Sequence, residues 1–72
     1  SLQRRAQMHV MLATFCVTMG ERPYIRAASG SDLAQDFAEG LEERLAALQR
    51  TLPGYPPARA RDNRATLLVL DR

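Results

Sequence analysis

The sequence predicts an α/β fold: a buried helix followed by a β-α-β unit, forming part of a larger parallel-sheet, Rossmann-like domain. Three observations predict it. The chain opens with a helical stretch that is apolar almost all round, and an amphipathic helix occupies its middle. Near the end, the apolar run 65–70 is typical of a parallel strand that is covered on both faces. With 72 residues, too few for two domains, 1–72 is expected to be a single partial domain.

The first helix is predicted over about 2–19, which contains neither proline nor glycine. Large apolar side chains recur along it at helical spacing: Met8, Leu12, Phe15 and Met19. A helix that is apolar nearly all round is normally buried on several sides, and a chain this short cannot easily surround one. We therefore expect the rest of a longer chain to pack on this helix and on the strands.

A short strand and a second helix are predicted next. Gly20 is expected to end the first helix, and the proline-led segment at about 23–27 predicts the strand. The second helix is predicted over about 32–51, with Asp32 as its N-cap and Gln35 completing a capping box. Apolar residues repeat along it every three or four positions, which is typical of an amphipathic helix.

The segment 53–64 is rich in proline and arginine and predicts an extended, exposed linker. It contains a P-x-x-P pattern like that of peptides bound by aromatic grooves, but Arg59 lies three residues after Pro56 rather than two, so a loop is favoured. The strand 65–70 then completes the β-α-β unit, whose crossover is expected to be right-handed. Because two strands alone would leave both edges open, a wider sheet is expected.

Charge and composition exclude several classes of function. An acidic middle section lies between two arginine-rich ends, yet the net charge is only +2, so no nucleic-acid partner is predicted. No apolar run approaches the ~20 residues that span a bilayer, so no direct membrane insertion is expected. One cysteine and one histidine cannot build a disulfide or a zinc site, and no cofactor or metal is expected. The lone thiol points to a reducing compartment such as the cytoplasm.

Three residues were considered for chemistry, and no catalytic residue is predicted. Asp71 follows the last strand, where ligands of parallel sheets gather, so a nucleotide-binding α/β enzyme with Asp71 on a metal is one alternative. That alternative lacks a lysine and a phosphate-binding loop. His9 and Cys16 lie two helical turns apart, about 10 Å, which is too far for a nucleophile–base pair. A structural His9 and a core Cys16 are therefore expected, and the protein is not expected to be an enzyme.

A second alternative is a small self-contained protein that oligomerises through its apolar helix.

Gly40 inside the second helix costs about 1 kcal/mol relative to alanine, and indicates either close backbone approach or a local weakness.

Three segments, taken in register, resemble one family. Residues 13–26 (ATFCVTMGERPYIR) are similar to the pattern A-T-x-C-x-T-L-x-E-Y-P-x-[IV]-R, and the helix from Leu33 is similar to L-A-x-x-(I/V)-x-x-x-L. Residues 65–72 (ATLLVLDR) are similar to L-L-I-L-D-R. These are patterns of the SM family, the Sec-one/Munc-eighteen-like syntaxin-binding proteins. The chain departs from them at Arg22, where an aromatic residue is common, and at Ala27, where a tyrosine often stands.

The resemblance implies a fragment of the second, α/β domain of an SM protein. Such proteins are not enzymes; they clasp a syntaxin-type SNARE and template SNARE assembly in vesicle docking and fusion. The implied partner is a syntaxin-type SNARE bound by the full-length protein, and the implied location is cytoplasmic, peripheral to membranes through that partner. Because the syntaxin cradle lies mainly in other domains of the family, no partner-binding residue is assigned here. The roles of Arg26 and Arg72 stay open.

Overall fold

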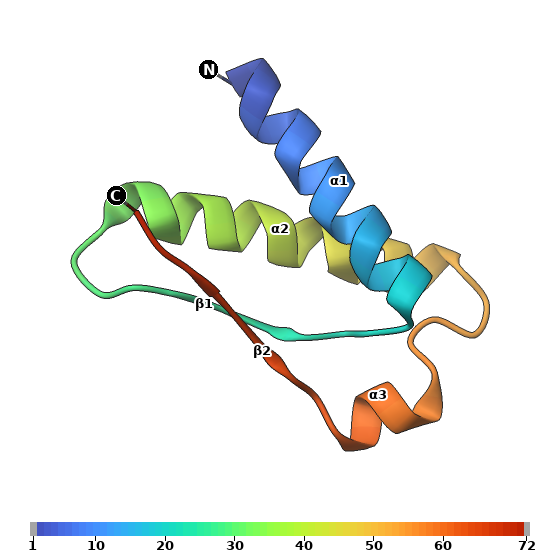
Figure 1. Cartoon of the computed structure of the whole chain (residues 1–72). Helices are drawn as coiled ribbons and strands as arrows, with labels where there is room; N and C mark the ends of the chain where they lie inside the picture. Colours follow the sequence, from blue (N-terminus) through green and yellow to red (C-terminus); the bar gives the residue numbers. More distant parts are fainter. Residues whose placement is uncertain (1, 72) are drawn as a thin grey trace.

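The computed structural model describes residues 2–71. Its elements, in chain order, are α1 (Leu2–Met19), β1 (Tyr24–Ala27), α2 (Asp32–Thr51), α3 (Ala58–Asp62) and β2 (Thr66–Val69) (Figure 1). The two strands pair in parallel, with Tyr24 opposite Thr66 and Ala27 opposite Val69. The predicted α/β class, with helix and strand alternating around two parallel strands, is therefore confirmed as a small open sheet.

Helix α2 is the element on which α1 and both strands pack. It contacts α1, β1 and β2, and Figure 1 shows α1 crossing it. Leu41 and Leu45 on α2 are fully buried. The same core contains Ala13 and Cys16 from α1, Ala38 from α2, Ile25 from β1, and Tyr55 from the segment after α2. The apolar stripe predicted for the second helix is therefore the centre of the core.

Helix α1 is less covered than its composition predicts. Within this chain, the residues it buries are Ala13 and Cys16, which face α2 and the core. Its opposite face is open, with Met11 70% and Phe15 62% exposed. The physical reason is size: once α2 has packed on one side of α1, residues 2–71 provide no further helix or strand that covers the other side.

Ser31, and not Asp32, is the N-cap of α2. The Ser31 backbone is extended (φ −116°, ψ 108°), and its Oγ accepts a hydrogen bond from the amide of Ala34 at 3.1 Å. Asp32 lies in the first turn instead, where a carboxylate is favoured by the positive end of the helix dipole. The prediction was wrong by one residue because both side chains can cap, and only the geometry at the third helical amide decides between them.

The segment 53–64 is not an extended, exposed linker. It contains the short helix α3, in which Ala60 is fully buried. Tyr55 is buried as well, and its hydroxyl donates to the carbonyl oxygen of Glu21 at 2.7 Å. Arg59 donates to the Glu21 carboxylate at 2.8 Å. The composition was misleading because the prolines stand directly before α3, where a missing amide costs a helix nothing.

Gly40 marks a close approach of α1 and α2. A Cβ at Gly40 would lie 2.6 Å from Cε1 of His9 and 3.0 Å from its Nε2. The His9 ring is held there, because its Nε2 lies 3.0 Å from the carbonyl oxygen of Phe37, which can only accept. The ring also packs against the Phe37 ring, with centroids 4.3 Å apart. Of the two explanations for Gly40, close approach is therefore the one the structure supports.

Replacing Gly40 by alanine should lower the free energy of unfolding by about 1–2 kcal/mol, because overpacking outweighs the gain in helix propensity. The matched control is the same change in a His9→Ala background, where the space is free and Gly40→Ala should instead stabilise by up to about 1 kcal/mol. Urea unfolding of the complete protein that contains this chain measures both. Equal effects in the two backgrounds would show that His9 is not the obstacle.

Candidate functional site

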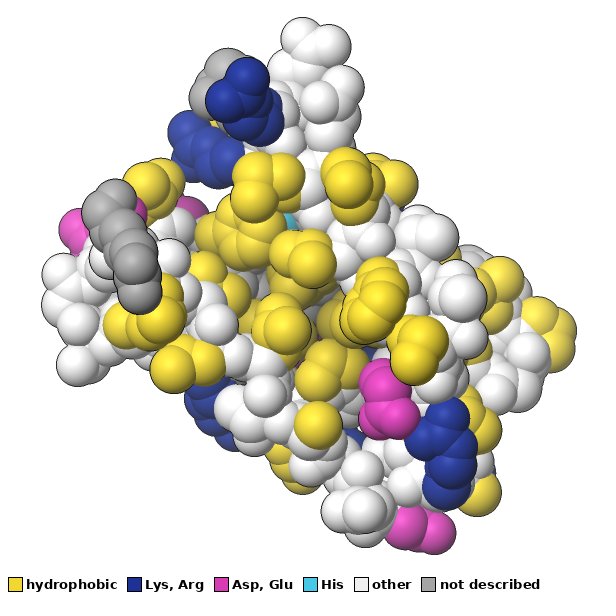
Figure 2. Space-filling view, in the orientation of Figure 1, with side chains coloured by type: hydrophobic (Ala, Val, Ile, Leu, Met, Phe, Trp, Pro, Cys, Tyr) yellow, Lys and Arg dark blue, Asp and Glu magenta, His cyan; other side chains and the backbone are white. Residues whose placement is uncertain are grey.

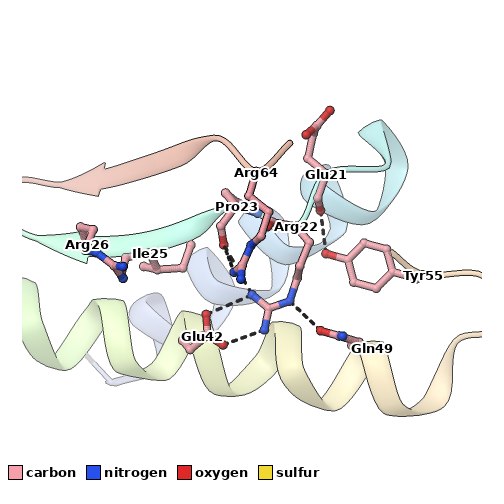
Figure 3. A network of polar contacts seen from close by, with 9 residues as sticks. All are labelled: Glu21, Arg22, Pro23, Ile25, Arg26, Glu42, Gln49, Tyr55 and Arg64. Carbon is pink, nitrogen blue, oxygen red and sulfur yellow. Dashed lines mark hydrogen bonds and ion pairs between the residues drawn. The ribbon is translucent and has the colours of Figure 1, made fainter. Parts of the chain in front are cut away.

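Arg22 is a buried charged residue, only 7% exposed, at the junction between α1 and β1. Its Nη1 and Nη2 donate to the two carboxylate oxygens of Glu42, at 3.0 and 2.6 Å. Its Nε donates to Oε1 of Gln49 at 2.9 Å, and Figure 3 shows both partners rising from α2. A guanidinium fork satisfied by a carboxylate and an amide is the arrangement that makes a buried arginine tolerable.

Arg64, just before β2, extends this network. Its Nε donates to the carbonyl oxygen of Arg22 at 2.8 Å, and its Nη2 to that of Pro23 at 3.3 Å (Figure 3). Its guanidinium also stacks on the Tyr24 ring, 3.6 Å from the centroid. Arg64 therefore connects the segment before β2 to the segment before β1. Arg22 in turn connects the segment before β1 to α2.

Several pKa values follow from these contacts. The hydrogen bond from Arg22 lowers the pKa of Glu42 below its ordinary value of 4.5, and the same bond raises the pKa of Arg22. Burial raises the pKa of the Cys16 thiol and of the Tyr55 hydroxyl. The thiol is thus held protonated within the core, in a form that is a poor nucleophile.

The structure places the residues considered for chemistry apart from one another. His9 lies at the crossing of α1 and α2, whereas Cys16 lies in the core, and no hydrogen bond joins them in the part of the chain that is described. Asp71 accepts a hydrogen bond from the Ser31 hydroxyl at 3.0 Å, so the carboxylate after β2 supports the N-cap of α2. Arg26 donates to its neighbouring carbonyl, that of Ile25, at 3.2 Å.

Arg72 lies outside the described residues. Over residues 2–71, no group of three or more His, Cys, Asp or Glu is arranged to hold a metal ion. A search of the same residues finds no helix with the length and hydropathy of a membrane span.

Large apolar side chains of α1 and of its neighbouring segments are left exposed. We define the apolar face as Met8, Met11, Phe15 and Met19, which follow one side of α1, together with Leu33 and Leu70. A hollow of about 380 Å³ between α1, α2 and the end of β2 is lined by Met8, Leu33 and Leu70. Figure 2 shows hydrophobic side chains gathered over this region. Patches of this kind on a protein surface usually mark an interface.

Sequence reasoning missed the Arg22 network. Two signals were present: Arg22 departs from the aromatic residue expected there, and Glu42 and Gln49 stand seven residues apart, on one side of α2. Neither signal names the partner, because the partners lie 20 and 27 residues away along the chain.

The parallel sheet, the two long helices and the three matching segments define the class as one that resembles the SM family. Comparison with known proteins confirms this resemblance. The chain is 31% identical over 70 residues to protein transport protein sec1 of Dictyostelium discoideum, an SM protein, and this match covers 97% of the chain. It spans about 11% of the length of that relative. No family model matches the chain, and no solved structure matches it.

The Arg22–Glu42 pair makes stability depend on pH. Because the pKa of Glu42 is lowered in the folded state, the pair's contribution is fully present above the ordinary value of 4.5 and is lost as the pH falls through the lower folded value. Glu42→Gln should reduce stability at neutral pH by about 1 kcal/mol, a figure discounted for the partial exposure of Glu42. The variant should also show a shallower loss of stability in acid.

The matched control for this prediction is Glu43→Gln, which removes the neighbouring exposed carboxylate and should change stability by less than about 0.5 kcal/mol. Urea unfolding of the complete protein at a series of pH values measures both variants. Identical pH profiles for the wild type and Glu42→Gln would contradict the assignment.

Proposed function

We propose that this chain is a structural piece of the second, α/β domain of an SM-type protein. In this proposal the complete protein binds a syntaxin-class SNARE and regulates SNARE assembly in vesicle docking and fusion. The similarity to protein transport protein sec1, over 97% of the chain, is the observation that carries the proposal. The segments that resemble the family supply much of the core. Ala13, Cys16 and Ile25 come from the first segment and Ala38 and Leu41 from the second, while the third adds the partly buried Leu67 and Val69.

The apolar face supports a structural role for α1. Burying a large apolar side chain contributes about 1.5–3 kcal/mol, so leaving several of them in water on one helix forgoes much of the stability available to so small a unit. In the proposal, the rest of the longer chain packs on the apolar face and on the open edges of the sheet. Met11 and Phe15 are then core residues of the complete domain rather than surface residues.

The polar residues support a scaffold rather than an enzyme. The carboxylate of Asp71 and the guanidinium of Arg22, which chemistry could have used, are both engaged in holding elements together. We therefore propose that the protein is not an enzyme and that it is cytoplasmic, reaching membranes through its SNARE partner. The residues that contact the SNARE lie outside this proposal, because the family's cradle is formed mainly by other domains.

The complete protein should form a stoichiometric complex with a syntaxin-class SNARE from the same cell, measured by calorimetry and by light scattering after size exclusion. Absence of a complex with every syntaxin-class SNARE tested would contradict the proposal. The enzyme alternative predicts something different: a magnesium–nucleotide complex should raise the melting temperature of the complete protein, and Asp71→Asn should abolish that rise.

Residues 1–72 produced alone should be poorly folded and prone to aggregate, because the apolar face and the strand edges lack cover. Met11→Gln and Phe15→Gln should make this isolated chain more soluble while destabilising the complete protein, an opposite pair of effects that a surface position would not give. Circular dichroism, light scattering and thermal unfolding measure them. A cooperative transition with a monomeric mass would contradict this expectation, and a single defined oligomer would favour the self-contained alternative.

A further inference from the structure

A second hollow, separate from the apolar face, lies beside the Arg22 network. It has a volume of about 320 Å³ and is formed by α2, α3 and the segments that lead into them and into the strands. We call it the arginine pocket and define it by its lining residues: Arg22, Glu42, Gln49, Pro56, Arg61 and Arg64. Its charged residues are thus three arginines and one carboxylate.

The charges in the arginine pocket do not balance. Glu42 is bound by both terminal nitrogens of Arg22, so this carboxylate is already neutralised and the pKa of Glu42 is lowered accordingly. The nearby Glu21 carboxylate is bound by Arg59. Arg61 and Arg64 therefore supply two positive charges that no carboxylate within residues 2–71 pairs with.

Both guanidinium groups also donate to backbone carbonyls. Arg64 is fixed by two backbone carbonyls and by stacking on Tyr24, which leaves its Nη1 available. Arg61 donates from Nη1 to the carbonyl oxygen of Pro56 at 3.3 Å, and its Nε and Nη2 have no hydrogen-bond acceptor among the residues that the structure describes. An anchored guanidinium with a free N–H group, such as that of Arg64, loses little conformational freedom when it binds an anion.

We propose that the arginine pocket binds a phosphate group, with Arg61 and Arg64 as the residues that contact it. Two unpaired positive charges match the charge of a phosphate monoester, which is about −1.5 to −2 at neutral pH. The planar fork of arginine also fits phosphate oxygens in pairs. Arg22 lines the same pocket and acts as a positioning residue, since its Nε, Nη1 and Nη2 already donate to Gln49 and Glu42.

The group that enters can come from a phosphorylated serine of a protein segment or from free phosphate. The hollow is large enough for either, and the same two arginines would bind both. This inference does not depend on the proposed function, because it rests on the contacts of the pocket alone.

The test is a titration of the complete protein with O-phosphoserine, inorganic phosphate and unmodified serine, followed by calorimetry. Saturable binding of O-phosphoserine and of inorganic phosphate is expected, and unmodified serine should not bind. Arg61→Gln should weaken that binding about tenfold, because it removes a charge-assisted contact. Arg61→Lys keeps the positive charge but loses the planar guanidinium, so its affinity should lie between that of the wild type and that of Arg61→Gln. The matched control is Arg44→Gln, an exposed arginine of α2 outside the pocket, which should bind as the wild type does.

The melting temperatures of the variants without ligand should equal that of the wild type, which separates loss of binding from loss of folding. Tighter binding of O-phosphoserine than of phosphate assigns the pocket to a modified protein segment, and equal binding assigns it to the free anion. The proposal is overturned if neither O-phosphoserine nor inorganic phosphate binds, or if Arg61→Gln and Arg44→Gln weaken binding equally.

Discussion

The burial of Leu41 and Leu45 on α2 is the interaction on which the rest of this structure depends. Both side chains are fully buried within the core that α2 shares with α1 and β1. Each contributes about 1.5–3 kcal/mol, which is a large share of the stability that so small a unit can have. Gly40 stands directly before Leu41 and lets the His9 ring of α1 approach the helix closely. The absence of a side chain at Gly40 thus lets α1 pack closely against α2, next to the buried Leu41.

The Arg22 network adds a second constraint, which fixes the relative positions of the elements more than it adds to the stability of the fold. Arg22 is buried, whereas the Glu42 side chain is 45% exposed, so the pair contributes little net stability. Removing Glu42 nevertheless leaves the buried charge of Arg22 without its main partner. Arg22 must therefore meet Glu42 and Gln49, and Arg64 must meet the carbonyls beside them. This requirement sets how the end of α1, both strand lead-ins and α2 come together. It also explains how an arginine can occupy a position where the family usually has an aromatic residue.

Much of the fold could be predicted from local patterns, because periodicity and capping are local. The repeat of apolar residues along α2 predicted its buried stripe, and the run 65–70 predicted a strand that pairs in parallel. Helix α3 was missed because a helix of five residues that follows a run of prolines carries almost no periodic signal. The links from Arg22 to Gln49 and from Arg64 to Arg22 span 27 and 42 residues, and no local pattern reports contacts at that range. The candidate sites therefore had to come from the structure.

Met11, which is 70% exposed in this chain, reports most directly on whether the apolar face is interior surface of a larger domain. The decisive measurement is the rate of peroxide oxidation of Met11 in the native complete protein, read by mass spectrometry and compared with the rate after unfolding in urea. The account predicts strong protection in the native protein, because the rest of the chain covers α1. Equal rates in the native and unfolded proteins would contradict it.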